Sequence, residues 1–441
     1  MGKIKVSNSD FSQSNVQIAG YKHAAVSIIA SSAYLNTKIK IKNTPRVEDT
    51  FVLSEILETL GADVSFNNDT LLIDTRNLSG YEIPEYLSEK VHGTLYLIPT
   101  ILGRMGKVRI GPSGGCQIGE NKVAGVRPIH HMIDVLKKFG ATFEFENNNL
   151  LGYCDGFTAC EIDIMDYSDR KDILTGPLCS GATKTAILAA VCTKKGTTII
   201  HNPYPKPDVT ELISFLSLVG FKIVENGRSI YITSPDELQE ATHHLISDVT
   251  EIITYISCSV YMKHPMTLNN ITVDRVKKAL KPELDYLNKM NIKLEWDRES
   301  LFIPYADQVK SIDIDVTSIG IYSDSQPFFT LMLLRGEKNS RITEHVWHNR
   351  FGYAEELKKL GLNLEVFENS VYIKPGYPVQ DNSLDAGDLR AAAVLILSAL
   401  KTPGTTTINN VQHLTRGYED FIDTLQSLGA NIEVMSTKIL I

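Results

Sequence analysis

One pattern recurs along the chain and limits the folds open to it. Apolar residues at helical spacing are followed by a glycine or small break and then by a short alternating segment. Six copies begin at residues 56, 135, 215, 286, 356 and 424; the first reads ILETLGADVSFNNDTLLI and the last TLQSLGANIEVMSTKILI. Each changes from helical spacing to strand alternation, with Asn, Asp, Glu or Gly at the turn. The pattern predicts a helix followed by a β-hairpin, six times.

The break after each helix and the segment before it complete the repeating unit. Glycine at the break supplies a left-handed helix end, and the fourth copy has Asn291 there, the next most tolerant residue type. A second strand and helix precede each copy, as in GTTIIHNP before DVTELISFL. The unit is therefore βαβαββ. Its length of roughly 70 to 80 residues is too great for a solenoid repeat and suits a small α/β subdomain.

The chain has 441 residues, more than one hydrophobic core usually supports. Six units in this length predict two similar domains of three units each. Low-complexity segments and Pro/Gly-rich linkers are both missing from the sequence, so the boundary has to come from the repeat. We expect the ligand to bind between the two domains, where small-molecule sites often lie.

Composition excludes several classes of function. The formal net charge of −8 argues against a general nucleic-acid-binding protein. The start, MGKIKVSNSDF, lacks the long apolar stretch of a signal peptide. Apolar runs such as TAILAAVC are far too short to span a bilayer. We therefore expect a cytoplasmic protein without a membrane partner, and nothing in the sequence requires more than a monomer.

The cysteines and histidines do not form a metal-binding pattern. Six scattered cysteines include no pair of CxxC motifs, and we expect five of them to be inert packing residues and all of them free thiols. A metal site is open only to four histidines, for which solvated loops are the favoured placement: His130, His131, His243 and His244. Cys116 differs from the other cysteines because it lies in a glycine-rich loop, GPSGGCQIGENKVAGVRP, that ends near Arg127.

Seven motifs in order carry a resemblance to a known family. They are AGYKHAAV, GGCQIG…RPI, SGATKTAILAAV, SDSQPFFTLMLL, HNRFGYAEEL, GDLRAAAVLIL and RGYEDF. On these motifs the chain resembles the enolpyruvyl transferases, and within them the UDP-N-acetylglucosamine 1-carboxyvinyltransferase (MurA-like) family, over essentially its whole length. The resemblance implies a two-domain inside-out α/β barrel with pseudo-threefold symmetry in each domain, in agreement with the six repeats.

The resemblance also implies where the domains divide. One domain would span residues 22–235 and carry the Cys116 loop. The other would combine residues 1–21 with 236–441 and carry Asp324, Arg390 and Arg416, so that the chain crosses between domains twice. The glycine-rich loop would close over the ligands as a lid.

The reaction implied by the resemblance moves an enolpyruvyl group from phosphoenolpyruvate to a hydroxyl and releases phosphate. It needs a proton for the methylene carbon, a base for the hydroxyl and cations around phosphate and carboxylate. By resemblance, Cys116 is the general acid and can bond to the substrate, and Lys22 and Arg127 hold phosphoenolpyruvate. Asp324 would accept the hydroxyl proton. No metal or other cofactor is implied, because phosphoenolpyruvate is a co-substrate.

The remaining site residues of the resemblance lie in the second half of the chain. Arg390 and Arg416 match arginines near phosphate and carboxylate, a role suited to the planar guanidinium group. Asp388 belongs to the same motif as Arg390, and a structural Arg390–Asp388 ion pair is the alternative. Arg350 is open between substrate contact and domain packing. Asp324 has its own alternative, the N-cap of the apolar helix that follows it.

The sequence departs from the family mainly where the sugar nucleotide is held. His23 stands in place of an asparagine, and His92 replaces an arginine by a group that can be neutral at pH 7. Pro177 and Cys179 stand where a lysine and a serine contact the diphosphate, and Val249 replaces another arginine. Each lost charge-assisted contact is worth roughly 1.5–3 kcal/mol, which weakens a nucleotide-sugar ligand unless other groups compensate.

Two further departures concern the same part of the chain. ENKVAGV lengthens the loop before Arg127, which makes the assignment of that arginine depend on the loop. Met132 falls where the family has a histidine, beside His130 and His131.

Three interpretations of the function remain open. The first is the family reaction with UDP-N-acetylglucosamine, in cell-wall biogenesis. The second is a paralogue with another acceptor such as UMP, because related enzymes of nucleoside-antibiotic pathways are believed to use a uridine nucleotide. The third is a non-catalytic binding paralogue, which the presence of Cys116 and Asp324 disfavours. GGCQIG also disfavours the shikimate-pathway transferase, which lacks this cysteine loop.

Overall fold

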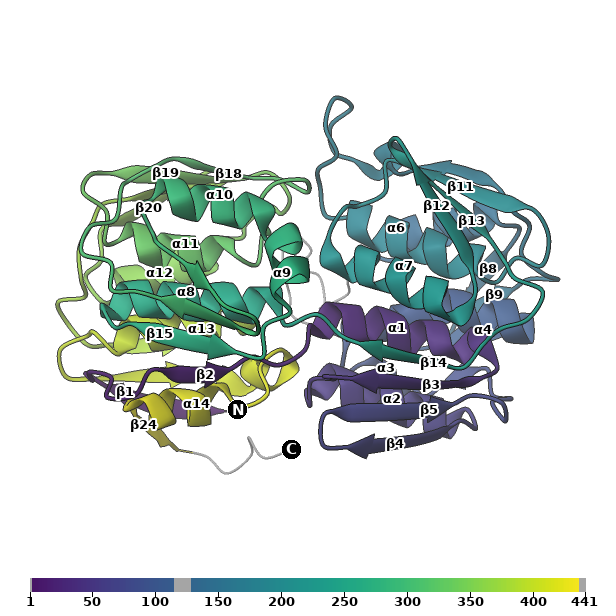
Figure 1. The fold of residues 1–441 in the computed structure, drawn as a ribbon, viewed down its shortest axis with the longest axis horizontal. Helices are drawn as coiled ribbons and strands as arrows, with labels where there is room; N and C mark the ends of the chain where they lie inside the picture. Colours follow the sequence, from purple (N-terminus) through teal and green to yellow (C-terminus); the bar gives the residue numbers. More distant parts are fainter. Residues whose placement is uncertain (1, 115–127, 436–441) are drawn as a thin grey trace. The chain divides into compact units, whose positions relative to one another are not determined.

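The computed structural model describes residues 2–114 and 128–435 of the chain. They form two compact units connected by two chain crossings (Figure 1). Unit 1 comprises residues 2–19 and 246–435, and unit 2 comprises residues 20–114 and 128–245. Cys116, Arg127 and the loop insertion between them lie outside the described residues.

Each unit contains three four-stranded sheets. The orders in unit 2 are β6-β7-β9-β8, β10-β11-β13-β12 and β14-β3-β5-β4, and those in unit 1 are β2-β15-β17-β16, β18-β19-β21-β20 and β22-β23-β1-β24. The first two strands of every sheet run parallel, and the next two are antiparallel to their neighbours. This arrangement is the expected βαβαββ unit, because a helix connects parallel strands and a tight turn connects antiparallel ones.

The strands of unit 2 are β3 (Lys38–Lys42), β4 (Asp63–Asn67), β5 (Thr70–Asp74), β6 (Glu82–Ile83), β7 (Lys107–Ile110), β8 (Thr142–Glu146), β9 (Asn149–Tyr153), β10 (Glu161–Asp163), β11 (Thr197–His201), β12 (Lys222–Asn226), β13 (Ser229–Thr233) and β14 (Ala241–His244). The strands of unit 1 are β1 (Lys3–Ser7), β2 (Asn15–Gln17), β15 (Met266–Asn269), β16 (Glu295–Trp296), β17 (Ser300–Ile303), β18 (Ile314–Val316), β19 (Ser340–Glu344), β20 (Leu364–Phe367), β21 (Ser370–Ile373), β22 (Ser383–Asp385), β23 (Thr405–Asn409) and β24 (Asn431–Val434).

The helices of unit 2 are α1 (Lys22–Leu35), α2 (Glu48–Thr59), α3 (Glu85–Ser88), η1 (His92–Tyr96), α4 (Leu97–Met105), α5 (His130–Lys138), η2 (Ile164–Tyr167), α6 (Cys179–Ala190) and α7 (Pro207–Val219). The helices of unit 1 are α8 (Val249–Met262), α9 (Val273–Ala279), α10 (Lys281–Lys289), α11 (Gln326–Leu333), α12 (Gly352–Lys358), α13 (Leu389–Ala399), η3 (Val411–Arg416) and α14 (Phe421–Leu428). None of these described helices is long and apolar enough to cross a membrane.

The core of unit 1 is built on three helices, α8, α11 and α13. They pack against one another, and every residue of all three is buried. A helix that is apolar on all sides is stable only where other elements surround it. The sheets therefore lie outside these helices, which gives the inside-out α/β barrel (Figure 1). In unit 2, α1 packs on α4 and α4 packs on α6.

The predicted helix–hairpin segments are confirmed in five copies, as β4–β5, β8–β9, β12–β13, β16–β17 and β20–β21. All six breaks have positive φ, as a left-handed helix end requires: Gly61, Gly140, Gly220, Asn291, Gly361 and Gly429. Local chemistry thus determines the hairpins.

The sixth copy differs from its prediction. Its helix and first strand are α14 and β24, but the predicted second strand, KILI at residues 438–441, lies outside the described residues. The third place in this sheet, which the second hairpin strand takes in the other five, is filled by β1, which pairs antiparallel with both β23 and β24. The N-terminal strand therefore completes the last repeat of unit 1.

The first strands of two repeats are exchanged along the chain. β14 belongs to the sheet of β3 in unit 2, with which it pairs in parallel, but the next helix along the chain, α8, lies in unit 1. In the same way, β2 pairs in parallel with β15 of unit 1, but the next helix, α1, lies in unit 2. The expected boundary at residue 235 would place β14 in the second domain. Its pairing with β3 instead extends unit 2 to residue 245, and the other crossing falls after residue 19 rather than 21.

Candidate active site

Most of the described residues that were expected in the site lie at or just before the starts of helices. In unit 2, Lys22 and His23 begin α1, and His92 begins η1. In unit 1, Asp324 lies two residues before α11, and Arg350 lies two residues before α12. Asp388 is the N-cap of α13, and Arg390 is in the first turn of that helix. Arg416 is the last residue of η3. The structure describes these two groups in separate units, and each is considered by itself.

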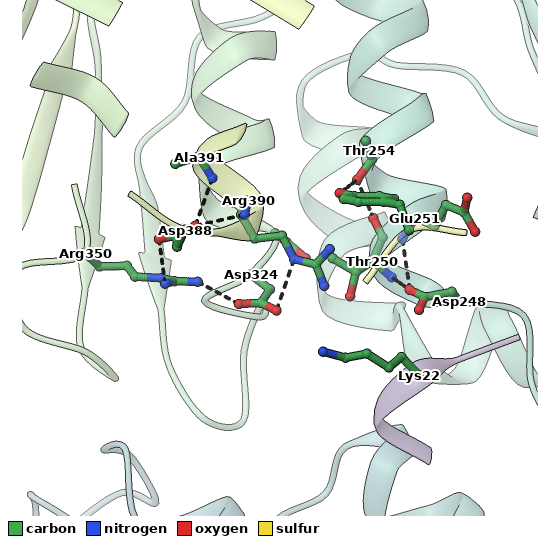
Figure 2. Close-up of polar contacts among 12 residues, drawn as sticks. Lys22, Asp248, Thr250, Glu251, Thr254, Asp324, Arg350, Asp388, Arg390 and Ala391 are labelled. Carbon is green, nitrogen blue, oxygen red and sulfur yellow. Dashed lines mark hydrogen bonds and ion pairs between the residues drawn. The ribbon is translucent and has the colours of Figure 1, made fainter. Parts of the chain in front are cut away.

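An ion-pair cluster in unit 1 joins four of the expected residues (Figure 2). The Asp324 carboxylate accepts from Arg350 Nη2 at 2.7 Å and from Arg390 Nε at 3.2 Å. Arg350 Nη1 donates to Asp388 Oδ2 at 3.2 Å. The side chains of Arg350 and Arg390 are only 3% and 4% exposed, whereas Asp324 keeps 30% of its side-chain surface exposed. Two buried guanidinium groups therefore hold a carboxylate that still reaches solvent.

Asp388 has two roles in this cluster. Its Oδ1 accepts from the backbone N–H groups of Arg390 at 2.8 Å and Ala391 at 2.9 Å, which caps α13, while Oδ2 accepts from Arg350. The alternative Arg390–Asp388 side-chain pair is therefore not the arrangement of the cluster. Arg390 pairs with Asp324, and Arg350 bridges Asp324 and Asp388.

Asp324 does not cap the helix that follows it. Ser325 occupies the N-cap position of α11 and makes no side-chain capping bond. The carboxylate of Asp324 is engaged by the two arginines instead, because a charged guanidinium donor binds a carboxylate more strongly than a neutral backbone N–H does. The N-cap alternative for Asp324 is thus wrong.

Two elements surround Arg390 further. The guanidinium carbon lies 5.3 Å from the centre of the Tyr418 ring, and the Tyr418 hydroxyl is 2.8 Å from Thr254 Oγ1 of α8. Burial lowers the pKa of Arg390, but Tyr418, Asp324 and Asp248 raise it by more, so it lies above the ordinary range of arginine. Arg390 is therefore a permanent buried cation.

The start of α8 adds two acidic residues that sequence reasoning missed. Asp248 Oδ1 accepts from the N–H groups of Thr250 and Glu251 at 2.8 and 3.0 Å (Figure 2). Burial, with a smaller effect of Asp248, raises the pKa of Glu251 to about 8, and its Oε2 accepts from Ala19 N at 3.0 Å. The segment SDVTEI carries the signal for Asp248, because an aspartate before a helix is a preferred N-cap.

Lys22 lies at the start of α1 in unit 2. Its Nζ is 3.4 Å from Asp49 Oδ1, and both side chains are buried. His23 follows it, with its ring 5.5 Å from that of Tyr21, and His92 is 6.2 Å from the Tyr96 ring. Unit 2 thus contributes one buried lysine and two imidazoles at these helix starts.

Similarity to known proteins agrees with this architecture. A family model described as EPSP synthase (3-phosphoshikimate 1-carboxyvinyltransferase) matches residues 7–425. The chain belongs to this family. Its members transfer enolpyruvyl (carboxyvinyl) groups, so the protein is an enolpyruvyl transferase.

Relatives of the EPSP synthase family match the chain along its full length. The UDP-N-acetylglucosamine 1-carboxyvinyltransferase of Wolbachia sp. subsp. Brugia malayi is 31% identical over 95% of this chain and 96% of its own, and that of Thermotoga maritima is 30% identical over 99% and 100%. The crystal structure of the enolpyruvyl transferase NikO from Streptomyces tendae matches with a TM-score of 0.92 and 33% identity over 98% of both chains. EPSP synthase from Acinetobacter baumannii, at 14% identity and a TM-score of 0.77 over 99% and 100%, shows the fold alone.

Two of the departing residues are completely buried inside their units. Cys179 is 0% exposed and its thiol lies 3.6 Å from the backbone oxygens of Tyr167 and Thr175. Val249 is also 0% exposed, in α8. Met132 is buried as well, in α5. These side chains pack within the protein, so none of them replaces the polar contact that the family resemblance implies at its position.

The other cysteines and the histidines are consistent with packing rather than chemistry. Cys154, Cys179, Cys192 and Cys258 are buried, Cys160 is half-buried, and all five are free thiols whose pKa is raised by burial. The expected placement in solvated loops is wrong for all four histidines, which lie in α5 and β14, although His130 and His244 are exposed there. His131 is buried in α5, where burial and His130 lower its pKa to about 4, and His243 is buried in β14, 3.1 Å from Glu211.

Metal ligands do not gather anywhere in the part of the chain that the structure describes. Residues 2–114 and 128–435 contain no group of three or more His, Cys, Asp or Glu side chains placed to hold an ion.

Proposed function

We propose that this enolpyruvyl transferase uses phosphoenolpyruvate as donor and a uridine nucleotide as acceptor. The hydroxyl oxygen of the acceptor bonds to C2 of the donor, and a proton is added to the methylene carbon. Loss of phosphate, together with one proton of the methyl group so formed, then gives the enolpyruvyl ether. Each step changes charge at an oxygen, so fixed cations and a fixed base are the main catalytic needs.

The observation that carries the proposal is the fixed, part-exposed carboxylate of Asp324. Arg350 and Arg390 engage both of its oxygens, at 2.7 and 3.2 Å, from buried positions. A carboxylate held in one orientation with a solvent-accessible edge is suited to accept the proton of an attacking hydroxyl. In this proposal Asp324 is the general base.

The donor is an anion with one carboxylate and one phosphate. We assign its binding to Lys22, Arg127, Arg390 and Arg416, and the protonation of its methylene carbon to Cys116. Guanidinium groups match both anions because they donate two parallel hydrogen bonds. His23, His92, Arg350 and Asp388 are assigned to acceptor binding or to the support of these groups.

UDP-N-acetylglucosamine is the first candidate acceptor. Relatives that have this name are about 30% identical to the chain and align with it over nearly their whole length. Their similarity supports a role in peptidoglycan precursor synthesis. No cofactor is required in this proposal, because phosphoenolpyruvate is a co-substrate that supplies both the enolpyruvyl group and the phosphate leaving group.

A uridine nucleotide without a sugar diphosphate, such as UMP, is the second candidate. The specific observation in its favour is the burial of Cys179 and Val249, because the family resemblance implies a serine that contacts the diphosphate at the first position and an arginine at the second. Loss of two such contacts, each worth roughly 1.5–3 kcal/mol, disfavours a diphosphate ligand.

Purified protein mixed with phosphoenolpyruvate and either nucleotide distinguishes these acceptors. Phosphate release is measured, and mass spectrometry detects a product heavier by the enolpyruvyl group. Release with UDP-N-acetylglucosamine supports the first candidate, and release only with UMP supports the second. If no phosphate is released with any uridine nucleotide, the result would contradict the proposed function and favour a non-catalytic role.

Alkylation of the thiol tests the role of Cys116 separately. An epoxide inhibitor of the fosfomycin type should modify Cys116 and abolish turnover, and substrates should protect against it. Modification of another cysteine with full activity retained would contradict the assignment.

A further inference from the structure

Two buried glutamates hold the turn that carries Asp324, and the proposed reaction uses neither of them directly. Glu283 lies in α10 and is 0% exposed. Glu344 is the last residue of β19 and is 1% exposed. Buried carboxylates are costly unless several donors satisfy them, so their partners indicate what the protein gains from them.

Glu283 contacts the turn on both sides of Asp324. Its Oε1 accepts from the backbone N–H of Tyr322 at 2.7 Å and from Ser325 Oγ at 3.3 Å. One carboxylate oxygen therefore fixes the residue two positions before Asp324 and the residue immediately after it. The backbone of Asp324 has little freedom to move between these two anchors.

Glu344 connects the same turn to the segment that leads to Arg350. Ser323 Oγ donates to its Oε2 at 2.7 Å, and the N–H groups of Val346 and Trp347 donate to its Oε1 at 2.8 and 3.3 Å. The pKa of Glu344 lies above its ordinary value, because burial raises it by more than these hydrogen bonds and Arg350 lower it. Glu344 thus links the two segments that carry the partners of the Asp324–Arg350 ion pair.

We propose that Glu283 and Glu344 are positioning residues that set the place and orientation of the Asp324 carboxylate. The inference rests on the proposed function, in which Asp324 accepts the proton of the acceptor hydroxyl. Neither glutamate touches Asp324, so they act through the backbone and through Ser323 and Ser325. A displacement of the base affects the rate of the reaction more than the affinity for substrate, because alignment matters most in the transition state.

Three variants with graded effects test the inference. Glu344→Leu removes the acceptor for Ser323 and for two backbone N–H groups, and it should lower kcat by roughly 10–100-fold with KM for both substrates little changed. Glu344→Gln keeps a side-chain oxygen for Val346 and Trp347 and an amide group that can donate to Ser323, so it should restore most of the activity. Ser323→Ala removes one hydrogen bond without creating a cavity in the core and should give a smaller loss of kcat.

A matched control shows whether loss of any buried carboxylate has the same effect. Glu211→Gln alters a buried glutamate of unit 2, paired with His243 and outside the proposed site. Its kcat should stay at the wild-type value even if its melting temperature falls. Equal loss of kcat in Glu211→Gln and Glu344→Leu would mean that the effect comes from stability, which overturns the proposal.

Coupling to Asp324 is the most specific readout. If Glu344 acts only by positioning Asp324, then in an Asp324→Asn background the change Glu344→Leu should alter the residual kcat by no more than about twofold. A full additional 10–100-fold loss in the double variant would show that Glu344 acts independently of Asp324. That result overturns the inference and leaves the proposed function intact.

Amide hydrogen exchange keeps the inference testable if no acceptor is turned over. Glu283→Leu and Ser323→Ala should speed exchange at residues 322–326, while the strands of the same sheet keep their protection. Unchanged exchange in this turn contradicts the positioning role whatever the activity. Faster exchange in an enzyme inactive with every acceptor supports the anchoring of the turn and contradicts only the proposed function.

Discussion

The two units are built from the same three repeats, yet the starts of their central helices differ in charge. In unit 1, aspartate side chains cap α8 and α13, and Asp324 precedes α11. In unit 2, the described helices α1, α4 and α6 have neither an acidic residue in the first turn nor a side-chain cap. One scaffold thus supports an interlocked acid–arginine network in one unit and helix starts without acidic residues or side-chain caps in the other.

The difference indicates a division of tasks. Capping aspartates satisfy the backbone N–H groups of unit 1 and hold its arginines in place, so the network in that unit fixes geometry. In unit 2, the first turn of α1 contains the cation Lys22 and no acidic residue, a combination that favours a nearby anion electrostatically. We infer that unit 1 supplies the fixed base and that the residues of unit 2 have more influence on which anion binds.

The largest expected effect is that of Asp324→Asn, which retains the shape of the side chain and removes the base. We expect kcat to fall by roughly 10²–10⁴-fold, the usual contribution of general acid–base catalysis. Phosphate release measures kcat, and circular dichroism verifies the fold. Activity within a few-fold of wild type would remove the catalytic asymmetry between the units.

Arg350→Lys should have the next largest effect. Arg350 bridges Asp324 and Asp388 with two different nitrogens, at 2.7 and 3.2 Å, and a single ammonium group cannot reproduce this fork. We expect a loss of roughly 3 kcal/mol in the free energy of unfolding, because two buried contacts lose their geometry. Urea denaturation measures it. The matched control is Arg341→Lys, at an exposed arginine of the same unit, which should leave the free energy of unfolding almost unchanged. An equal decrease in the free energy of unfolding for both variants would argue against a structural network.

Glu251→Gln should change how stability depends on pH. The pKa of Glu251 is raised from 4.5 to about 8, so the folded state binds its proton more tightly than the unfolded state does. Wild-type stability from this group is present below about pH 4.5 and is lost as pH rises toward 8. The glutamine variant has no such loss.

The stability difference between Glu251→Gln and wild type should therefore grow in favour of the variant by roughly 2 kcal/mol between pH 6 and pH 8. Thermal unfolding at several pH values measures it. The exposed Glu337→Gln change in the same unit is the matched control and should run parallel to wild type. A constant difference for Glu251→Gln would mean that its carboxylate is ionised throughout.

The sequence predicted the local parts of both units. Five helix–hairpin segments formed as expected, and every break, from Gly61 to Gly429, has the left-handed conformation. These features depend on residues close together in the chain. The pairing of β1 with β24 and the exchange of β2 and β14 were missed, because long-range pairing leaves no signal in the strand itself.

The candidate site shows the same distinction. Motif positions identified Asp324, Arg350, Asp388 and Arg390, which the structure brings together in one cluster. Which arginine pairs with which aspartate was not predicted, since the four residues come from two repeats and their pairing depends on how the helices pack. Tyr418 and Asp248 were missed for that reason, although both lie in or near motifs.

The smallest expected effect sharpens the role of unit 2. Pro177 stands where the family resemblance implies a lysine, and it is part-exposed just before α6, whereas Cys179 and Val249 are fully buried. Pro177→Lys therefore reverses one departure at a part-exposed position and adds a positive charge there. We expect KM for UDP-N-acetylglucosamine to fall by about tenfold, as one charge-assisted contact allows, with KM for phosphoenolpyruvate unchanged.

Pro235→Lys adds the same charge to another part-exposed proline of unit 2 and should leave both KM values unchanged. A fall in both variants would mean that net charge rather than position attracts the nucleotide. A fall in neither would mean that the helix starts of unit 2 do not discriminate between acceptors, and selectivity would then have to be sought among the residues of unit 1. Because the role proposed for Asp324 and its arginines is common to every acceptor, that outcome would contradict the inferred division of tasks.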